Sequence, residues 1–220
     1  GSLSFAEMIW LMMRGDRPSP AQAKLFEAAL VSAVDHGPQA PSIAAARMAI
    51  TCGVGLNNAL ASGVNMLGDV HGGAGEQAIE MYEFIRDGEG DLSASLDTWR
   101  AEHGPYLPGF GHRFHKPEDP RAPRLMELVR ACPDVSGQFA DIALSIQAQL
   151  SSERGKGVAM NIDGATAVIY AELGFPAPLA RGLFCLSRSV GIVAHAWEQQ
   201  QQGGRNKGPT PPQYRWTFEE

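Results

Sequence analysis

Helix-start signals recur along this chain, whereas alternating runs of strand-forming residues are almost absent. Ser4 and Glu7 have the spacing of a capping box, in which a hydroxyl and a carboxylate bond to the free N–H groups at a helix start. Ser19-Pro20 with Gln22 repeats this signal, because proline is tolerated in the first helical turn. A half-buried strand would instead alternate apolar and polar residues. The pattern therefore predicts an all-α fold.

Apolar periodicity and the glycine and proline breakers set the expected helix bounds. One helix follows Ser4 and stops at Gly15, and a second runs from Pro20 to about Val34. The later helices are expected over residues 43–60, 72–85, 125–130, 139–150, 163–173 and 178–198. Residues 158–160 are expected to form one short extended piece.

Residues 104–123 hold so many glycines and prolines that a regular helix there is excluded. This breaker-rich segment and the helices around it suggest a division into lobes. We expect residues 1–87 to form the first part of a large helical body and residues 88–174 to form a small lobe. Residues 175–220 would return to the body as a long helix and end in a tail.

The charge and the cysteines exclude several classes of protein. A net charge of −6 without a long basic run disfavours binding to nucleic acid or to an anionic membrane. No apolar run approaches the ~20 residues of a membrane span, and no signal peptide is recognised. No metal is expected, because His103, His112 and His115 lack zinc-ligand spacing. The odd set of cysteines contains no CxxC pair and predicts reduced thiols in a cytoplasmic protein: Cys52, Cys132 and Cys185.

His71 lies in the segment GDVHGGAGE, where two glycines allow the backbone to turn tightly beside a ligand. A helix is expected to begin just after them, so its free N–H groups would lie near the imidazole and favour the neutral form. A neutral histidine can donate a hydrogen bond to a carbonyl oxygen that becomes an enolate. The alternative is a turn histidine with a structural hydrogen bond.

The segment PGFGHRFHKPEDPRA places His112 after two glycines and before a run of cations. Arg113, His115, Lys116 and Arg121 could neutralise the phosphates or carboxylates of a ligand. Loops presented by a rigid scaffold often carry function. The alternative is a solvated basic loop.

Two charged residues lie inside apolar stretches, where a charge needs a partner or a cavity. Asp163 in MNIDGATAVIY is either a helix cap or a general base whose pKa rises on desolvation. Arg188 in FCLSRSVGIVAH is either half of a structural ion pair or a bidentate carboxylate-binding group. Asp35-His36 is a further candidate for a site. The alternative there is a helix end, where the helix dipole favours a histidine.

Together these segments resemble the citrate synthase superfamily over nearly the whole chain and in the family's order. LSFAEMIWLMMRGDRPSP is similar to an early helix pair, AVDHGPQAPSIAAAR to a substrate-contacting segment and GDVHGGAGE to the first catalytic-histidine loop. PGFGHRFHKPEDPRA is the most specific match. NIDGATAVIYAELGFP and FCLSRSVGIVAHAWEQ resemble the catalytic-aspartate and late-arginine segments. The resemblance implies a large helical body and a small lobe with the active site in the cleft between them.

The resemblance also implies a role for each candidate residue. Asp163 would remove the α-proton of acetyl-CoA while His71 hydrogen-bonds the thioester oxygen. His112 would protonate the keto oxygen of oxaloacetate. The implied substrate-binding residues are His36, Arg121 and Arg188, and those along CoA are Pro108, Gly109, Phe110, Gly111 and Lys116. The CoA thioester is a substrate, and neither a permanently bound cofactor nor a metal is implied.

The chain departs from a typical citrate synthase in three ways. It is much shorter, Gly164 follows the aspartate where an aromatic residue is usual, and the tail lacks the usual Arg-Pro segment. Arg205 or Arg215 would then have to complete the partner subunit's site. The short length, the NIDG window and the SRSVGIVAH helix are more similar to citryl-CoA lyases, including the C-terminal lyase module of ATP-citrate lyase.

We therefore expect an enzyme that cleaves citryl-CoA to acetyl-CoA and oxaloacetate through an enol. One alternative is a short citrate or 2-methylcitrate synthase, and another is a catalytically silent CoA-binding or assembly module. Family members form helical dimers, so we expect a homodimer or a higher homo-oligomer. The alanine-rich helix predicted over residues 43–60 would suit the interface.

Overall fold

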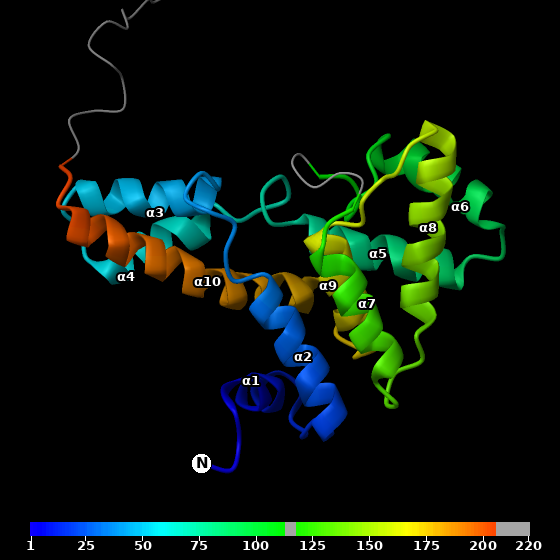
Figure 1. The fold of residues 1–220 in the computed structure, drawn as a ribbon, viewed down its shortest axis with the longest axis horizontal. Helices are drawn as coiled ribbons and strands as arrows, with labels where there is room; N and C mark the ends of the chain where they lie inside the picture. Colours follow the sequence, from blue (N-terminus) through cyan, green and yellow to red (C-terminus); the bar gives the residue numbers. More distant parts are fainter. Residues whose placement is uncertain (113–117, 206–220) are drawn as a thin grey trace, which may run out of the picture. The chain divides into compact units, whose positions relative to one another are not determined.

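The computed structural model describes residues 1–112 and 118–205, whose regular elements are helices (Figure 1). The helices are α1 (Phe5–Arg14), α2 (Pro20–Ser32), α3 (Pro41–Thr51), α4 (Leu56–Asn65), α5 (Ala74–Asp87), α6 (Leu92–His103), α7 (Arg121–Ala131), α8 (Gln138–Arg154), α9 (Ile162–Glu172) and α10 (Ala177–Gln202). The extended pairings in these ranges are two isolated bridges, Gly68–Gly72 and Phe110–Met160. The all-α prediction is confirmed, and the second bridge contains part of the predicted extended piece.

Both predicted capping boxes are present. Glu7 N donates to Ser4 Oγ at 3.2 Å, and Ser4 N donates to Glu7 Oε2 at 2.7 Å. Ser19 and Gln22 exchange the same two bonds at 3.1 and 3.0 Å. Gly15 ends α1 in the left-handed conformation, with a φ of 78°. Local sequence alone therefore sets the bounds of the first helix and the start of the second.

The single helix predicted over residues 43–60 is wrong, because the chain breaks between α3 and α4. Gly53 has a φ of 87°, which cannot continue a right-handed helix, and Gly55 precedes the first residue of α4. The two shorter helices pack against each other. The glycines at this break are a local stop signal that outweighs the alanine-rich periodicity.

Two further helices differ from the expectations. Helix α6 was not predicted, although Asp91 is a typical N-cap and accepts a bond from Ala94 N at 2.8 Å. Helix α7 begins at Arg121, inside the segment expected to hold no helix. Its Pro123 lies in the first turn, where the missing N–H has no helical partner to lose.

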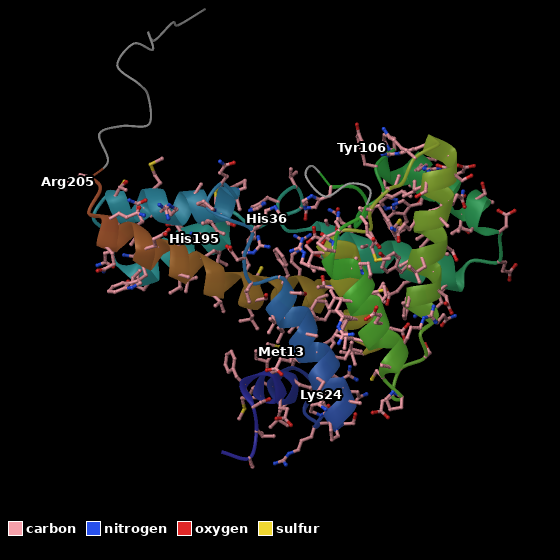
Figure 2. The ribbon with its side chains drawn as sticks, in the orientation of Figure 1. Met13, Lys24, His36, Tyr106, His195 and Arg205 are labelled. Carbon is pink, nitrogen blue, oxygen red and sulfur yellow. The ribbon has the colours of Figure 1, made fainter. Side chains whose placement is uncertain are left out.

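The chain divides into two compact units. The first consists of residues 1–35 and 67–188, and the second consists of residues 36–66 and the chain from Ser189 onward. Figure 2 labels His36, His195 and Arg205, which belong to the second unit. The predicted boundaries at residues 88 and 175 differ from the boundaries between these two units, so the body and the lobe stay a prediction.

Helix α9 is central to the first unit and packs against α2, α5, α7 and α8. Every residue from Gly164 to Ala171 is buried, as expected for a helix that is apolar on all sides. Trp10, Phe26 and Phe175 form an aromatic cluster in the same core, with ring centroids 5.1 to 5.6 Å apart. The first turn of this rigid helix carries Asp163.

The second unit contains α3, α4 and the part of α10 that follows Arg188. Its helices approach closely at Gly63, where a Cβ would lie 2.9 Å from Ser42 O. The buried hydrophobic cluster of this unit is small and rich in alanine: Ala40, Ile43, Ala46, Ile50, Ala59, Ile192 and Ala196.

Helix α10 is long and apolar enough to cross a membrane by length and composition alone. It has 26 residues, and the mean hydropathy of its most apolar 18-residue window is 1.2. However, 44% of that window is buried inside the protein, and the helix carries Arg181 and Arg188. Core helices pass the same test, so this feature is weak evidence for a membrane span.

Candidate active site

His71 lies in the tight turn that precedes α5. Gly68 N donates to His71 O at 2.9 Å and closes the turn. Gly73 has no room for a side chain, since a Cβ there would lie 2.7 Å from Asp69 O. Helix α5 then starts at Ala74 without a side-chain cap. The positive end of this helix therefore follows His71 directly, as the glycine pair predicted.

The segment before His112 is fixed by the chain around the start of α9. Gly111 N donates to Ala159 O at 2.6 Å, and Asn161 N donates to Gly109 O at 2.9 Å. These bonds flank the Phe110–Met160 bridge. The predicted extended piece therefore holds the stem of the loop that presents His112.

The same segment lies directly against the first turn of α9. A Cβ on Gly164 would collide with Gly109 O, and a Cβ on Gly109 would lie 2.7 Å from Gly164 Cα. Gly109 also has a φ of 84°, which disfavours any other residue. A larger residue after Asp163 would push the two backbones apart. This contact gives a physical reason for glycine at position 164.

Asp163 is half-buried in the first turn of α9, and positive or protonatable groups surround its carboxyl group. Desolvation raises the pKa of the Asp163 carboxyl above its ordinary value. The groups that oppose this rise are, from the strongest to the weakest, Arg188, Arg121, His112 and His71. They come from α10, α7, the segment before α7 and the turn before α5, all within the first unit. The structure thus brings these predicted residues to one electrostatic centre.

Arg188 is the most deeply buried cation of this centre, with 3% of its surface exposed. Its Nε donates to Ala33 O at 3.1 Å, and its guanidinium lies 4.8 Å from the centroid of the Phe184 ring. Burial lowers the pKa of Arg188, whereas the charges of Asp163 and Asp35 oppose that shift. The side chain is therefore fixed in place beside the carboxyl that it stabilises.

Arg121 is held by Asp119, a buried carboxylate that the sequence analysis did not single out. Arg121 Nε and Nη2 donate to its two oxygens at 3.0 and 2.8 Å, and the backbone N of Arg121 donates at 3.1 Å. The Asp119 side chain is fully buried, while that of Arg121 is 32% exposed. A carboxylate two residues before a candidate arginine was the available signal. This pairing orients Arg121 at the start of α7.

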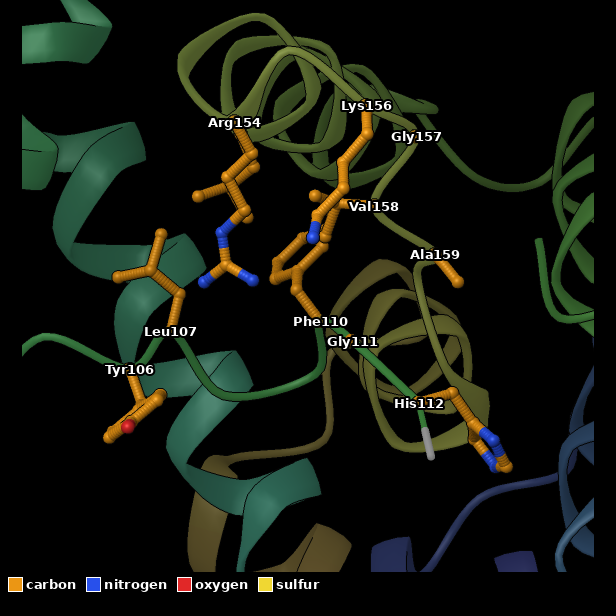
Figure 3. A pocket seen from close by; sticks show the side chains of 11 residues that line it. Tyr106, Leu107, Phe110, Gly111, His112, Arg154, Lys156, Gly157, Val158 and Ala159 are labelled. Atoms are coloured by element: carbon orange, nitrogen blue, oxygen red, sulfur yellow. The ribbon is translucent and has the colours of Figure 1, made fainter. Parts of the chain in front are cut away.

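A cavity of about 590 Å³ lies beside the His112 segment (Figure 3). Arg154 and Lys156 extend into it from the end of α8, toward Leu107 and Phe110. Sequence reasoning missed both cations, although their positions on either side of Gly155 were a usable signal. Of the predicted CoA-contacting residues, this cavity is lined by Phe110 and Gly111. Its two cations suit an anionic ligand.

Some predicted site residues are not brought to this centre. His36 is exposed and belongs to the second unit, so its contact with substrate stays a prediction. Arg205 also belongs to the second unit, where it is exposed after the end of α10. Lys116 and Arg215, together with Arg113 and His115, lie outside the described residues.

The described residues contain no group of three or more His, Cys, Asp or Glu side chains that could hold a metal ion. His103, one of the histidines considered above, stacks on Trp99 with a centroid distance of 3.9 Å. Its Nδ1 lies 3.2 Å from Trp99 O. These contacts give His103 a packing role on α6.

The chemistry available at the centre is acid–base chemistry. A carboxyl group with a raised pKa can exchange a proton with a weak carbon acid. An imidazole beside the start of α5 can hydrogen-bond a developing enolate oxygen. The two arginines can orient a ligand that carries several carboxylates.

Comparison with known proteins identifies the family. Residues 1–210 match the family described as citrate synthase, C-terminal domain. The chain belongs to the citrate synthase family. The resemblance noted in the sequence is therefore confirmed. Members of this family are enzymes that act on acyl-CoA and on oxaloacetate or citrate.

This chain aligns with different shares of the length of individual citrate synthase family members. Citryl-CoA lyase from Hydrogenobacter thermophilus aligns with a TM-score of 0.89 and 32% identity, over 100% of this chain and 86% of that one. Citrate synthase from Thermoplasma acidophilum, solved with carboxymethyl coenzyme A and oxaloacetate, aligns with a TM-score of 0.81 and 25% identity over 100% of this chain and 59% of that one. Citrate synthase from Haloferax volcanii is 30% identical over 91% of this chain and 52% of its own length. The chain spans about half the length of the curated relatives it matches.

Proposed function

We propose that this chain is a citryl-CoA lyase-like enzyme that cleaves citryl-CoA to acetyl-CoA and oxaloacetate. The proposal is carried by the convergence of two histidines and two arginines on the Asp163 carboxyl within one compact unit. The likeness to a citryl-CoA lyase over the full length of this chain supports the direction of cleavage.

Each step of the cleavage uses a group at this centre. His112 accepts the proton of the citryl hydroxyl, and the C–C bond breaks as that oxygen becomes the keto oxygen of oxaloacetate. The electron pair of the broken bond passes to the enolate of acetyl-CoA, whose oxygen accepts a hydrogen bond from His71. Protonated Asp163 then delivers its proton to the enolate carbon. The raised pKa of Asp163 favours the protonated form that this step needs.

Binding would use the cations described above. Arg188 and Arg121 orient the carboxylates of the citryl group, and the bonds that Arg121 donates to Asp119 keep its guanidinium aligned. The CoA portion lies along Pro108, Gly109, Phe110 and Gly111, with Arg154 and Lys156 near its phosphates. Lys116 would add a further cation. His36 would contact the keto acid.

The alternative within the family is condensation, in which the same residues join acetyl-CoA or propionyl-CoA to oxaloacetate. The curated relatives favour it, because they are named citrate synthases and one is named citrate/2-methylcitrate synthase. A synthase must also hydrolyse the citryl thioester, whereas a lyase must not. Hydrolysis of citryl-CoA therefore separates the two activities.

The alternative from another class is a silent CoA-binding or assembly module. Such a module needs the cavity beside Phe110 but has no use for a carboxyl with a raised pKa. The presence of both features favours the enzyme. A module would bind CoA and show no turnover to lose on substitution.

We also propose that two copies associate through the second unit. The buried cluster of that unit is small, and large apolar side chains stay exposed on its helices: Met48, Val190, Val193 and Trp197. The last three lie at i, i+3 and i+7 on α10 and therefore share one face. Burying such a face against a second copy would supply the apolar burial that the unit lacks.

The deciding experiment supplies citryl-CoA and measures all four products. Oxaloacetate and acetyl-CoA with almost no free citrate support the lyase. Substantial citrate and free CoA would move the chain to the synthase. If none of the four forms, the silent module gains support.

The same assay tests the assignment of the acid. Asp163→Asn should lower the turnover number by roughly 10²–10⁴-fold, because its amide cannot deliver a proton. Asp97→Asn makes the same chemical change at a side chain on α6 that is 71% exposed, and should leave turnover unchanged. Equal activity of both variants would remove Asp163 from the mechanism.

A further inference from the structure

Asn161 bonds to both segments that carry proposed catalytic groups. Its Oδ1 accepts from Asp163 N at 3.0 Å and from Gly164 N at 3.2 Å. Its Nδ2 donates to Gly111 O, the carbonyl that precedes His112, at 2.9 Å. We propose that Asn161 is a positioning residue that fixes the Asp163 carboxyl and the His112 imidazole relative to each other. This inference rests on the proposed function and adds a residue to it.

The amide is needed because it accepts and donates at the same time. An aspartate or a serine can also cap a helix through an oxygen. A carboxylate has no proton to donate to a carbonyl, and a hydroxyl has a shorter reach. The backbone N of Asn161 adds a bond to Gly109 O at 2.9 Å. One residue therefore ties the loop stem to the start of α9 at two carbonyls.

The cap also affects what the Asp163 carboxyl is able to do. A carboxylate in the first turn of a helix commonly accepts bonds from the free N–H groups there, and these bonds lower its pKa. In this chain the N–H groups of Asp163 and Gly164 are bonded to Asn161. The carboxyl is thus kept for the groups that face it, which are His71, His112, Arg121 and Arg188.

Other contacts also hold the loop before His112 against α9, but they do not replace the bond from Asn161 to Gly111 O. Tyr82 OH donates to Gly164 O at 3.3 Å, and its ring meets Phe110 edge-on with centroids 6.4 Å apart. These contacts fix the depth at which the loop lies on α9. Asn161 supplies a side-chain hydrogen bond to the carbonyl that directly precedes His112.

Two substitutions separate the two roles of the amide. Asn161→Ser keeps a cap and loses the bond to Gly111, whereas Asn161→Ala loses both. In Asn161→Ser we expect the turnover number on citryl-CoA to fall about 10–100-fold with a smaller change in KM, because the acid and base are misplaced. In Asn161→Ala we also expect the Asp163-dependent limb of the pH–rate profile to move to lower pH, since that carboxylate can take over the cap. Asn57→Ser, at an exposed position, is the matched control.

The outcomes decide the inference. A wild-type turnover number in Asn161→Ser, or loss of stability alone in both variants with an unchanged pH profile, would overturn it. If the wild-type protein itself forms neither pair of products, the proposed function has failed, and amide hydrogen exchange decides the inference. Faster exchange over residues 109–112 and 162–165 in Asn161→Ala would then support the positioning role, and unchanged exchange would refute it.

Discussion

Asp163 and Arg188 are ionisable side chains whose pKa values move in opposite directions for the same reason. Burial raises the pKa of the carboxyl and lowers that of the guanidinium, because both charged forms lose water. Each charge partly offsets the shift of the other. The folded protein therefore holds a carboxyl that is easier to protonate than an ordinary aspartate, which suits a group that gives and takes a proton at carbon.

The raised pKa of Asp163 has a consequence for stability. The folded state binds this proton more tightly than the unfolded chain, so the contribution of Asp163 to stability falls as pH rises from its ordinary pKa of 3.8 through the raised folded value. Asp163→Asn should remove this loss, by about 1.4 kcal/mol for each pH unit crossed in that interval. Urea unfolding of both proteins over a pH series checks it. Parallel pH profiles of the two unfolding free energies would contradict the shift.

Two buried tyrosines form a natural comparison. Tyr82 OH donates to Gly164 O, whereas Tyr170 OH has no hydrogen-bond partner among the described residues. Tyr82→Phe should cost about 1 kcal/mol of unfolding free energy, because it removes a buried hydrogen bond to the Gly164 carbonyl. Tyr170→Phe should be neutral or stabilising, because it removes an unsatisfied hydroxyl. Urea denaturation of both variants measures the difference, and equal losses would show that Tyr170 has a partner.

At the scale of elements, the contact that matters most for the site joins the His112 loop to the first turn of α9. Gly109 and Gly164 face each other with no room for a Cβ on either residue. Asn161 and the Phe110–Met160 bridge hold the same segment. A loop on a buried helix is a more rigid support for catalysis than a loop facing solvent.

Gly109 and Gly111 separate steric contact from backbone strain. Both have a positive φ, of 84° and 87°. A Cβ at Gly109 would also meet the backbone of Gly164, whereas nothing lies within 4 Å of a Cβ at Gly111. Gly111→Ala should cost about 1–2 kcal/mol from strain alone. Gly109→Ala should cost more and should lower the turnover number as well. Unfolding free energies and rates on citryl-CoA test this order, and the reverse order would exclude the close contact.

At the scale of the whole molecule, the chain passes between the two compact units at residues 35–36, 66–67 and 188–189. The proposed acid and both proposed catalytic histidines belong to the first unit, while His36 and Arg205 belong to the second. The second unit has the smaller core and exposes apolar side chains on α3 and α10. It is therefore the part for which association with another copy would matter most.

The proposed association predicts the effect of a charge on α10. Trp197 is 51% exposed, and Trp197→Glu should raise the dimer dissociation constant at least about tenfold, which corresponds to roughly 1.4 kcal/mol. Phe5→Glu, at a side chain on α1 that is 80% exposed, is the matched control and should leave the oligomeric state unchanged. Light scattering after size exclusion over a range of concentrations measures both. A wild-type monomer at every concentration would overturn the association.

The sequence by itself determined those features that depend on neighbouring residues. The capping boxes at Ser4 and Ser19 and the turn at His71 are local, because their hydrogen bonds span a few residues. The family motifs identified the centre for the same reason, since each is a short continuous segment. Two local signals differ from the predicted helices: Gly53 ends a helix that the alanine-rich periodicity would continue, and Asp91 caps a helix that was not predicted.

Tertiary structure alone decided which distant residues meet. The Asp119–Arg121 pair is close in sequence, but its importance comes from the full burial of the carboxylate, which no local pattern displays. Position 164 has room only for glycine because the backbone of Gly109, 55 positions earlier in the chain, lies against it. Arg154 and Lys156 became candidates because the end of α8 lies beside Phe110. Burial and desolvation depend on packing between elements, and they are what turn an aspartate, an arginine and an asparagine of ordinary chemistry into parts of one site.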